Sequence, residues 1–217
     1  MLLQELAAAS GCSTASIKYY RREGLLPPGA RLTATRQEYG PRHLERLELI
    51  RVLREMADAP IPRIRRLAAL LDDPAVPLIA ALEEAQAIIL GADVEPAGGE
   101  RPRDEHPSVA VMLERLGWPD IDSVPRRALD ALVRTLESWE MPSDPETLLH
   151  YAEPMSRIAQ RELEYLRMGS AAGQEPSDDA VVLRAVSGTI AFDRLVHVLR
   201  ALGHTSLSVQ ASELPRE

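Results

Sequence analysis

The residues best suited to chemistry lie in one short segment, residues 13–25, and their types are those that bind nucleic acid. The segment reads STASIKYYRREGL, with one lysine and two arginines beside two tyrosines. Cationic side chains attract phosphates, while hydroxyls donate to phosphate oxygens or to base edges. The spacing predicts a helix, because Ser13 is a favourable N-cap and Gly24 stands where a left-handed residue ends a helix.

A shorter helix is expected immediately before this segment. Leu2, Leu3, Leu6 and Ala7 give an apolar face that ends at Gly11. A helix, a glycine turn and a capped basic helix predict a helix-turn-helix, whose second helix enters the major groove of DNA. The competing interpretation is that the cationic side chains are an ordinary solvated face.

The same residues resemble the MerR family of bacterial winged helix-turn-helix regulators, whose hallmark is T-I-R-Y-Y-E-x-x-G-L-L-x-P. Four stretches carry the resemblance: LQELA at 3–7, GCS at 11–13, SIKYY at 16–20 and EGLLP at 23–27. Ser16, Lys18 and Arg21 replace the family's Thr, Arg and Glu. The resemblance extends to about Leu71, roughly a third of the chain.

The resemblance and the residue types together give an expected set of DNA contacts from the helix-turn-helix, the wing and the helices after it. The set is Ser13, Thr14, Ser16, Lys18, Tyr19, Arg21, Arg22, Arg36, Tyr39, Arg42 and Arg63. Tyr20 is expected in the core instead. The resemblance also implies a homodimer on pseudo-palindromic promoter DNA, distortion of that DNA, and RNA polymerase as a partner at the promoter.

Residues 31–39 are compatible with a β-hairpin, the expected wing, although the family's Asn-Gly turn is missing. Pro41 suits the first position of a helix. Its periodic apolar residues predict an inward face, and a second helix follows from about Pro62 to Leu71. The expected inward side chains are Leu44, Leu47, Ile50, Leu53 and Met56, then Ile64, Leu67, Ala68 and Leu71; Arg46, Arg51 and Arg54 are expected outside.

Charge and composition divide the chain. The formal charge is +5 over residues 1–71 and −13 over residues 72–217, which together give −8. A basic head on an acidic body is typical of a DNA-binding module joined to a part that does not bind DNA. The single cysteine, Cys12, fits a reducing cytoplasm, and no targeting or membrane segment is evident.

The segment 72–91 is expected to hold one helix. Its apolar positions Leu78, Leu82, Ala85 and Ile89 follow a 4-3-4 spacing, a coiled-coil seam of only two heptads. On the residues alone, an amphipathic helix packed within its own chain is favoured. The resemblance reverses this preference and implies a dimerisation helix.

The remaining chain is expected to be a linker over residues 92–107, a helical domain over 108–203 whose last helix ends at Gly203, and a frayed tail over 204–217. The predicted fold class is therefore mainly α: a DNA-binding domain over 1–71 with a small β wing, a dimerisation helix, and a C-terminal helical bundle.

The helical domain is sparse in aromatic residues, which are either core anchors or the lining of a pocket for a small organic effector. The candidate effector residues are Trp118, Trp139, Tyr151, Met155 and Phe192. Glu146 and His150 lie four residues apart but are more typical of an ion pair than of metal ligands. The sequence predicts no metal site, no cofactor and no catalytic constellation.

The sequence thus predicts a transcription regulator modulated by an effector. The alternative is an architectural or recombination factor whose C-terminal bundle binds protein partners and no small ligand.

Overall fold

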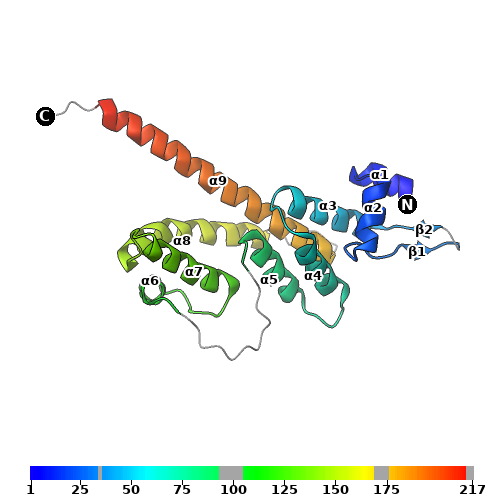
Figure 1. Ribbon diagram of the computed structural model, residues 1–217, viewed down its shortest axis with the longest axis horizontal. Helices are drawn as coiled ribbons and strands as arrows, with labels where there is room; N and C mark the ends of the chain where they lie inside the picture. The colour runs from blue at the N-terminus through cyan, green and yellow to red at the C-terminus, as the bar shows by residue number, and fades with distance from the viewer. Residues whose placement is uncertain (34–35, 93–104, 169–175, 214–217) are drawn as a thin grey trace. The chain divides into compact units, whose positions relative to one another are not determined.

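A computed structural model describes residues 1–33, 36–92, 105–168 and 176–213, without the side chains of 165–168 and of residue 213. The described residues are mainly helical, with one small sheet (Figure 1). The chain divides into two compact units, which we call the first unit (Met1–Ile89 with Pro176–Glu217) and the second unit (Leu90–Glu175). The predicted mainly-α class with a small wing is confirmed.

The first unit contains α1 (Leu3–Ser10), α2 (Thr14–Arg22), β1 (Ala30–Arg31), β2 (Gln37–Glu38), α3 (Pro41–Glu55), α4 (Ile61–Asp72), α5 (Leu78–Ile89) and α9 (Asp178–Glu213). The second unit contains α6 (Pro107–Leu116), α7 (Val124–Ser138) and α8 (Pro145–Met168). No described helix combines the length and the apolar character that crossing a membrane requires.

The helix-turn-helix forms at the predicted residues. Gly11 follows α1 in the left-handed region, with φ of 67°, and Gly24 follows α2 with φ of 73°. The Ser13 Oγ caps α2 by accepting a hydrogen bond of 3.0 Å from the backbone N–H of Ser16. The cap satisfies a helix-terminal N–H that would otherwise lack an intrahelical partner.

The wing is a short antiparallel hairpin in which Ala30 pairs with Glu38 and Arg31 with Gln37. Gly29 is required at its base, because a Cβ there would lie 2.5 Å from the carbonyl oxygen of Glu38. The hairpin lies at the expected position.

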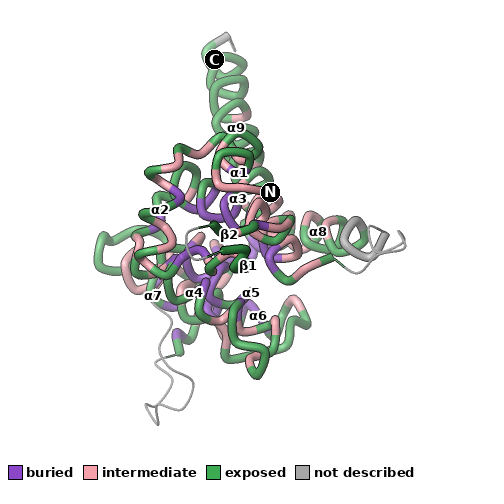
Figure 2. The backbone as a smooth tube through the Cα atoms, turned by 90° about the vertical axis from the view of Figure 1, so that its right-hand side faces the viewer, coloured by how far each residue is buried: buried purple, intermediate pink, exposed green. Residues whose placement is uncertain are grey.

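Two hydrophobic clusters hold the first unit together. One joins α1, α2, the wing and α3 through Leu6, Ile17, Leu26, Tyr39 and Leu47, all almost fully buried. The other joins α3, α4 and α5 to the first turns of α9, where Val182 and Val186 are 0% exposed (Figure 2). Burial of this apolar surface is what fixes the helices against one another.

The predicted inward faces of α3 and α4 are buried or partly buried, apart from Met56, which is 50% exposed. The prediction that Arg46 points outward is wrong, because its side chain is 1% exposed. The reason lies far along the chain: the Arg46 Nε donates to the carboxylate of Asp179, which is 0% exposed at the start of α9. The Arg46 Nη2 also donates to Asp72 Oδ1 at 3.0 Å.

The predicted end of the last helix at Gly203 is also wrong. Gly203 does not have a positive φ, whereas Gly117, which ends α6, has φ of 65°. A glycine in helical conformation costs only about 1 kcal/mol relative to alanine, so α9 continues to Glu213. Of the expected tail, residues 204–213 are therefore helical and residues 214–217 lie outside the described residues, as does most of the expected linker, residues 93–104.

The grouping of residues 108–203 into one domain differs from the structure, because α9 packs on α3 and α5 in the first unit. The second unit keeps α6, α7 and α8, whose buried side chains include Val109, Met112, Val133 and Leu149.

Candidate nucleic-acid interface

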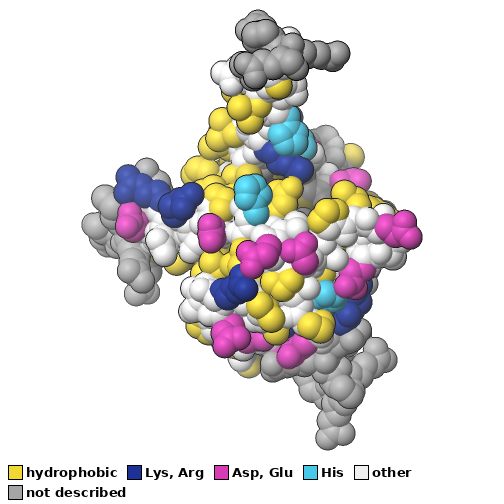
Figure 3. Space-filling view, turned by 90° about the vertical axis from the view of Figure 1, so that its left-hand side faces the viewer, with side chains coloured by type: hydrophobic (Ala, Val, Ile, Leu, Met, Phe, Trp, Pro, Cys, Tyr) yellow, Lys and Arg dark blue, Asp and Glu magenta, His cyan; other side chains and the backbone are white. Residues whose placement is uncertain are grey.

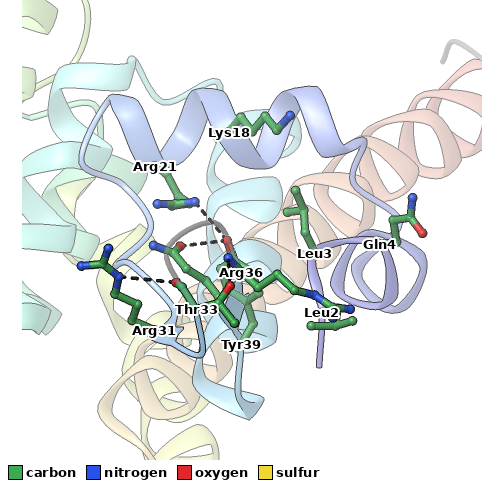
Figure 4. A pocket seen from close by; sticks show the side chains of 10 residues that line it. Leu2, Leu3, Gln4, Lys18, Arg21, Arg31, Thr33, Arg36 and Tyr39 are labelled. Atoms are coloured by element: carbon green, nitrogen blue, oxygen red, sulfur yellow. Dashed lines mark hydrogen bonds between the residues drawn. The ribbon is translucent and has the colours of Figure 1, made fainter.

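A cleft of about 420 Å³ lies on the first unit between the helix-turn-helix and the wing (Figure 4). Its lining comes from the start of α1, from α2, and from the wing and its turn. Four of the lining side chains are cationic: Lys18 and Arg21 on α2, Arg31 on β1 and Arg36 just before β2.

None of these four cations pairs with a carboxylate anywhere in the described parts of the chain. The Arg21 Nη1 donates instead to the hydroxyl of Tyr39 at 3.0 Å, and its Nε has no hydrogen-bond partner among the described residues. The Arg31 Nε donates to the carbonyl of Thr33 at 3.4 Å. Neutral partners leave the positive charge uncompensated, so the cleft is suited to an anion such as a phosphate.

The exposed face of α2 continues this surface. Lys18 and Tyr19 are exposed, and the Arg22 guanidinium lies 5.3 Å from the centre of the Tyr19 ring. The hydroxyls of Ser13 and Ser16 lie 2.8 Å apart at the start of the helix, beside the partly buried Thr14. A helix N-terminus presents backbone N–H groups to an anion, so these residues can contact DNA.

The two tyrosines predicted to separate into surface and core do so. Tyr20 packs against both hydrophobic clusters of the first unit, and this burial raises the pKa of its hydroxyl above the usual value. Tyr39, expected at the DNA surface, is 2% exposed. Its ring is in the core, and its hydroxyl orients Arg21 and donates to Gln37 Oε1 at 3.3 Å. We therefore assign Tyr39 to positioning the cationic side chains.

Arg42 and Arg63 differ from the expectation, because the structure pairs both with carboxylates. Arg42 Nε donates to Asp179 Oδ2 at 2.8 Å, and this hydrogen bond raises the pKa of Arg42 above its usual value. Arg63 Nε donates at 2.9 Å to Glu84, which is 1% exposed on α5. Both guanidiniums pin helices of the first unit together.

Arg31 and Gln37 line the cleft, and sequence reasoning missed them as site residues. The signal that could have found them is the hairpin itself, because the two residues pair across its strands. Residues opposite one another on a two-stranded ribbon project their side chains to the same face.

The four residues expected to form a dimer seam pack inside their own chain. Ala85 is 2% exposed, and Leu78, Leu82 and Ile89 pack against the cluster that includes α4 and α9. The placement matches the interpretation drawn from the residues alone, an amphipathic helix within its own chain.

The candidate effector residues are divided between the two units. Phe192 belongs to α9 in the first unit, whereas Trp118, Trp139, Tyr151 and Met155 belong to the second unit, where Trp139 is 66% exposed. The second unit has a cleft of about 370 Å³ with a largely polar lining that includes Arg115, Glu146 and His150. Glu146 pairs with Arg115 there, and no group of three potential metal ligands occurs among the described residues.

Comparison with known proteins agrees with the position of this interface. A family model described as "MerR HTH family regulatory protein" matches residues 1–71. The HTH-type transcriptional regulator ZntR homolog of Haemophilus influenzae (strain ATCC 51907 / DSM 11121 / KW20 / Rd) is 40% identical over 50 residues, which are 23% of this chain. The chain spans only 37% of the length of that relative.

A solved structure is similar over a longer stretch. The crystal structure of the "putative transcriptional regulator SCO5550" from Streptomyces coelicolor A3(2) matches over 100% of both chains, with 30% sequence identity and a TM-score of 0.65. The similarity therefore extends beyond the helix-turn-helix to α5–α9.

Proposed function

The chain belongs to the MerR family and is a helix-turn-helix transcription regulator, and from this premise we propose that it binds pseudo-palindromic promoter DNA as a homodimer and distorts it. The observation that carries the proposal is the cleft with four cations that face no carboxylate among the described residues. Phosphates neutralise such side chains and release counterions, which supplies much of the affinity of a DNA-binding protein.

The geometry supports a division of labour between α2 and the wing. α2 is the recognition helix, and its exposed Lys18, Tyr19 and Arg22 enter the major groove. Arg31 and Arg36 of the wing hold the adjacent phosphates, while Arg21 is oriented by Tyr39. Two copies of this surface are needed for the two half-sites of a palindrome.

Distortion of the bound promoter follows the behaviour implied for this family. Bending a site of 20–30 base pairs costs of order 1–6 kcal/mol, and phosphate contacts on both half-sites can offset that cost. The distorted promoter would engage RNA polymerase in the cytoplasm. An effector that prefers one state of the complex would shift the balance between distorted and relaxed DNA.

The effector part of this proposal is supported by the resemblance to the family, and its five candidate residues are divided between the two units. A protein partner is the second candidate for the second unit, and it is favoured by exposed apolar side chains such as Ile121, Trp139 and Met141.

The test is selection of bound sites from fragmented genomic DNA, followed by footprinting of the full chain on the strongest site. We expect protection of an inverted repeat whose half-sites are one helical turn or a multiple apart. Energy transfer between dyes at the two ends of that duplex should rise on binding if the DNA bends. Protected sites without inverted symmetry would overturn the homodimer, and unchanged energy transfer would overturn the distortion.

A further inference from the structure

The wing, which projects from the helices of the first unit (Figure 1), carries a leucine that the proposed function does not use. Leu32 follows β1 and is 54% exposed, more than any other large apolar side chain among the described residues of 1–71. Its backbone N–H donates to the carbonyl of Arg36 at 3.0 Å. Leu32 therefore stands opposite Arg36, one pair beyond Arg31 and Gln37 in the register of the hairpin.

The surroundings of Leu32 set it apart, because a single exposed leucine is otherwise common on protein surfaces. Figure 3 shows hydrophobic and acidic side chains side by side on one face of the molecule, and in the second unit the exposed Trp139 and Met141 flank Glu140 in the sequence. Leu32 lies instead between Arg31 and Arg36, which pair with no carboxylate in the described parts of the chain. Its neighbours attract the phosphates of a duplex, whereas the acidic surface repels them.

The backbone of the wing is braced both near Leu32 and at its base. The Arg36 N–H donates to Thr33 Oγ1 at 3.1 Å, and the Thr33 N–H donates to the Arg36 carbonyl at 3.2 Å. At the base, the Tyr39 N–H donates to the carbonyl of Met1 at 2.8 Å, and the Tyr39 ring is buried. A side chain held on a braced hairpin loses little conformational freedom when it contacts a ligand, so Leu32 is suited to press against DNA.

The position of the wing beside α2 decides which groove Leu32 meets. With α2 in the major groove, the cations of the cleft hold the neighbouring sugar–phosphate strand. This strand separates the major groove from the minor groove, so the wing on its other side lies over the minor groove. Arg36 suits that position, because a narrow minor groove concentrates negative potential, and residues opposite one another on a hairpin project to the same face.

We propose that Leu32 is an apolar wedge that enters the minor groove beside each half-site and partly unstacks one base step. The proposal rests on the proposed function, because it names a residue that produces part of the DNA distortion. Apolar side chains inserted between base steps kink a duplex toward the major groove. The leucine leaves water as it enters, and this gain offsets part of the cost of unstacking.

The wedge also gives the protein a way to select sequence without a hydrogen bond to a base. Pyrimidine–purine steps such as TA and CA are flexible and unstack most easily. An operator with such a step under the wing therefore costs less to distort than one without it. Leu32 is in this way a specificity-determining residue at a position that α2 does not read.

The first experiment uses 2-aminopurine, whose fluorescence rises when it unstacks, in the operator selected by the full chain. The probe replaces single adenines in the flanks of each half-site. We expect a rise on binding at one position beside each half-site for the wild type, its loss in Leu32→Ala, and its return in Leu32→Phe, which restores a bulky apolar side chain. Met56→Ala, which removes another exposed apolar side chain just after α3, is the matched control and should behave as the wild type.

A second experiment repeats the selection of operators with Leu32→Ala. The preference for a pyrimidine–purine step under the wing should fall roughly tenfold, which is within the discrimination that one base-pair position ordinarily carries. The salt dependence of affinity should stay that of the wild type, because the substitution removes no charge. The midpoint of urea unfolding should also stay unchanged, because the side chain is exposed.

The outcomes separate the wedge from the regulator itself. If the wild type binds its selected operator and no 2-aminopurine position responds, the wedge is overturned while DNA binding stands. A response that persists in Leu32→Ala also overturns the wedge, because another side chain then separates the bases. If the wild type selects no site at all, the proposed function fails and the wedge fails with it.

Discussion

The arginines of the first unit occupy two contrasting regions. On α3 and α4, the guanidiniums of Arg42, Arg46 and Arg63 form ion pairs with carboxylates. In the cleft between α2 and the wing, the cationic side chains meet only a hydroxyl and a carbonyl among the described residues. The same residue type therefore fastens helices in one region and remains available for an anion in the other.

The difference shows that local positive charge does not by itself identify a DNA surface. The carboxylates that neutralise α3 and α4 come from Asp179 at the start of α9 and Glu84 on α5, far along the chain. Because these partners are almost completely buried, the arginines they hold are structural. Removing an ion pair of α3 or α4 should therefore lower the stability of the fold. Adding a carboxylate to the cleft should instead lower the affinity for DNA.

The largest expected effect is on folding, from Arg46→Met. The substitution leaves the buried Asp179 with only Arg42, whose side chain is 47% exposed, and breaking a buried pair in this way typically costs roughly 3–5 kcal/mol. We expect this loss in the free energy of unfolding, measured by urea denaturation of the full chain. Adding Asp179→Leu should recover most of it, and a loss below about 1 kcal/mol for Arg46→Met alone would contradict the structural role.

Glu84→Ala should have the next largest effect on stability. Glu84 is 1% exposed and bridges Arg63 and Arg66, with side-chain exposures of 20% and 45%. We expect a loss of about 2 kcal/mol, because water screens the partly exposed arginines. The neighbouring Glu83→Ala, at an exposed position, is the matched control and should change the free energy of unfolding by less than about 0.5 kcal/mol.

Gln37→Glu tests the other region by adding to the cleft the kind of partner that α3 and α4 already have. The new carboxylate would lie beside the Tyr39 hydroxyl and close to Arg21. We expect DNA affinity to fall roughly tenfold, about 1.4 kcal/mol, with little change in stability. Gln86→Glu, the same change on exposed α5, should leave affinity unchanged in a fluorescence anisotropy titration.

Arg161→Ala should cause the smallest change in the free energy of unfolding. Arg161 donates to Glu164 at 2.8 Å on α8, and the two side chains are 64% and 58% exposed. Exposed pairs of this kind contribute little, so the free energy of unfolding should change by less than about 0.5 kcal/mol. A larger change would mean that exposed arginines also stabilise the chain, which would blur the contrast between the two regions.

The helix-turn-helix could be predicted because its signals are local. The Ser13 cap, the left-handed Gly11 and Gly24, and the inward Ile17 depend on residues within a few positions of each other. The β-compatible residues of the wing predict the hairpin, but they do not indicate that Arg31 lines the cleft.

Two of the differences between expectation and structure involve contacts between distant residues, and a third concerns local backbone conformation. The spacing of Arg46 on α3 is that of a surface residue, and its burial is explained by its partners Asp179 and Asp72. The residues of the α5 seam predict packing within their own chain and only the family resemblance implies a dimer; in the structure these residues pack against a cluster that includes Val182 and Val186 of the same chain. Glycine ends a helix only when it adopts the left-handed conformation, and the sequence does not reveal whether Gly203 does so.

The central claim is that the cleft binds DNA phosphates, and the salt dependence of affinity for a selected operator tests it most directly. The logarithm of the association constant should fall linearly with the logarithm of salt concentration. Arg36→Ala removes one phosphate contact from each of two copies, so we expect the slope to become shallower by about 2. Arg51→Ala, which removes a charge paired with Glu48 and Glu55 on α3, should leave the slope unchanged. Equal slopes for the wild type and Arg36→Ala would contradict the claim.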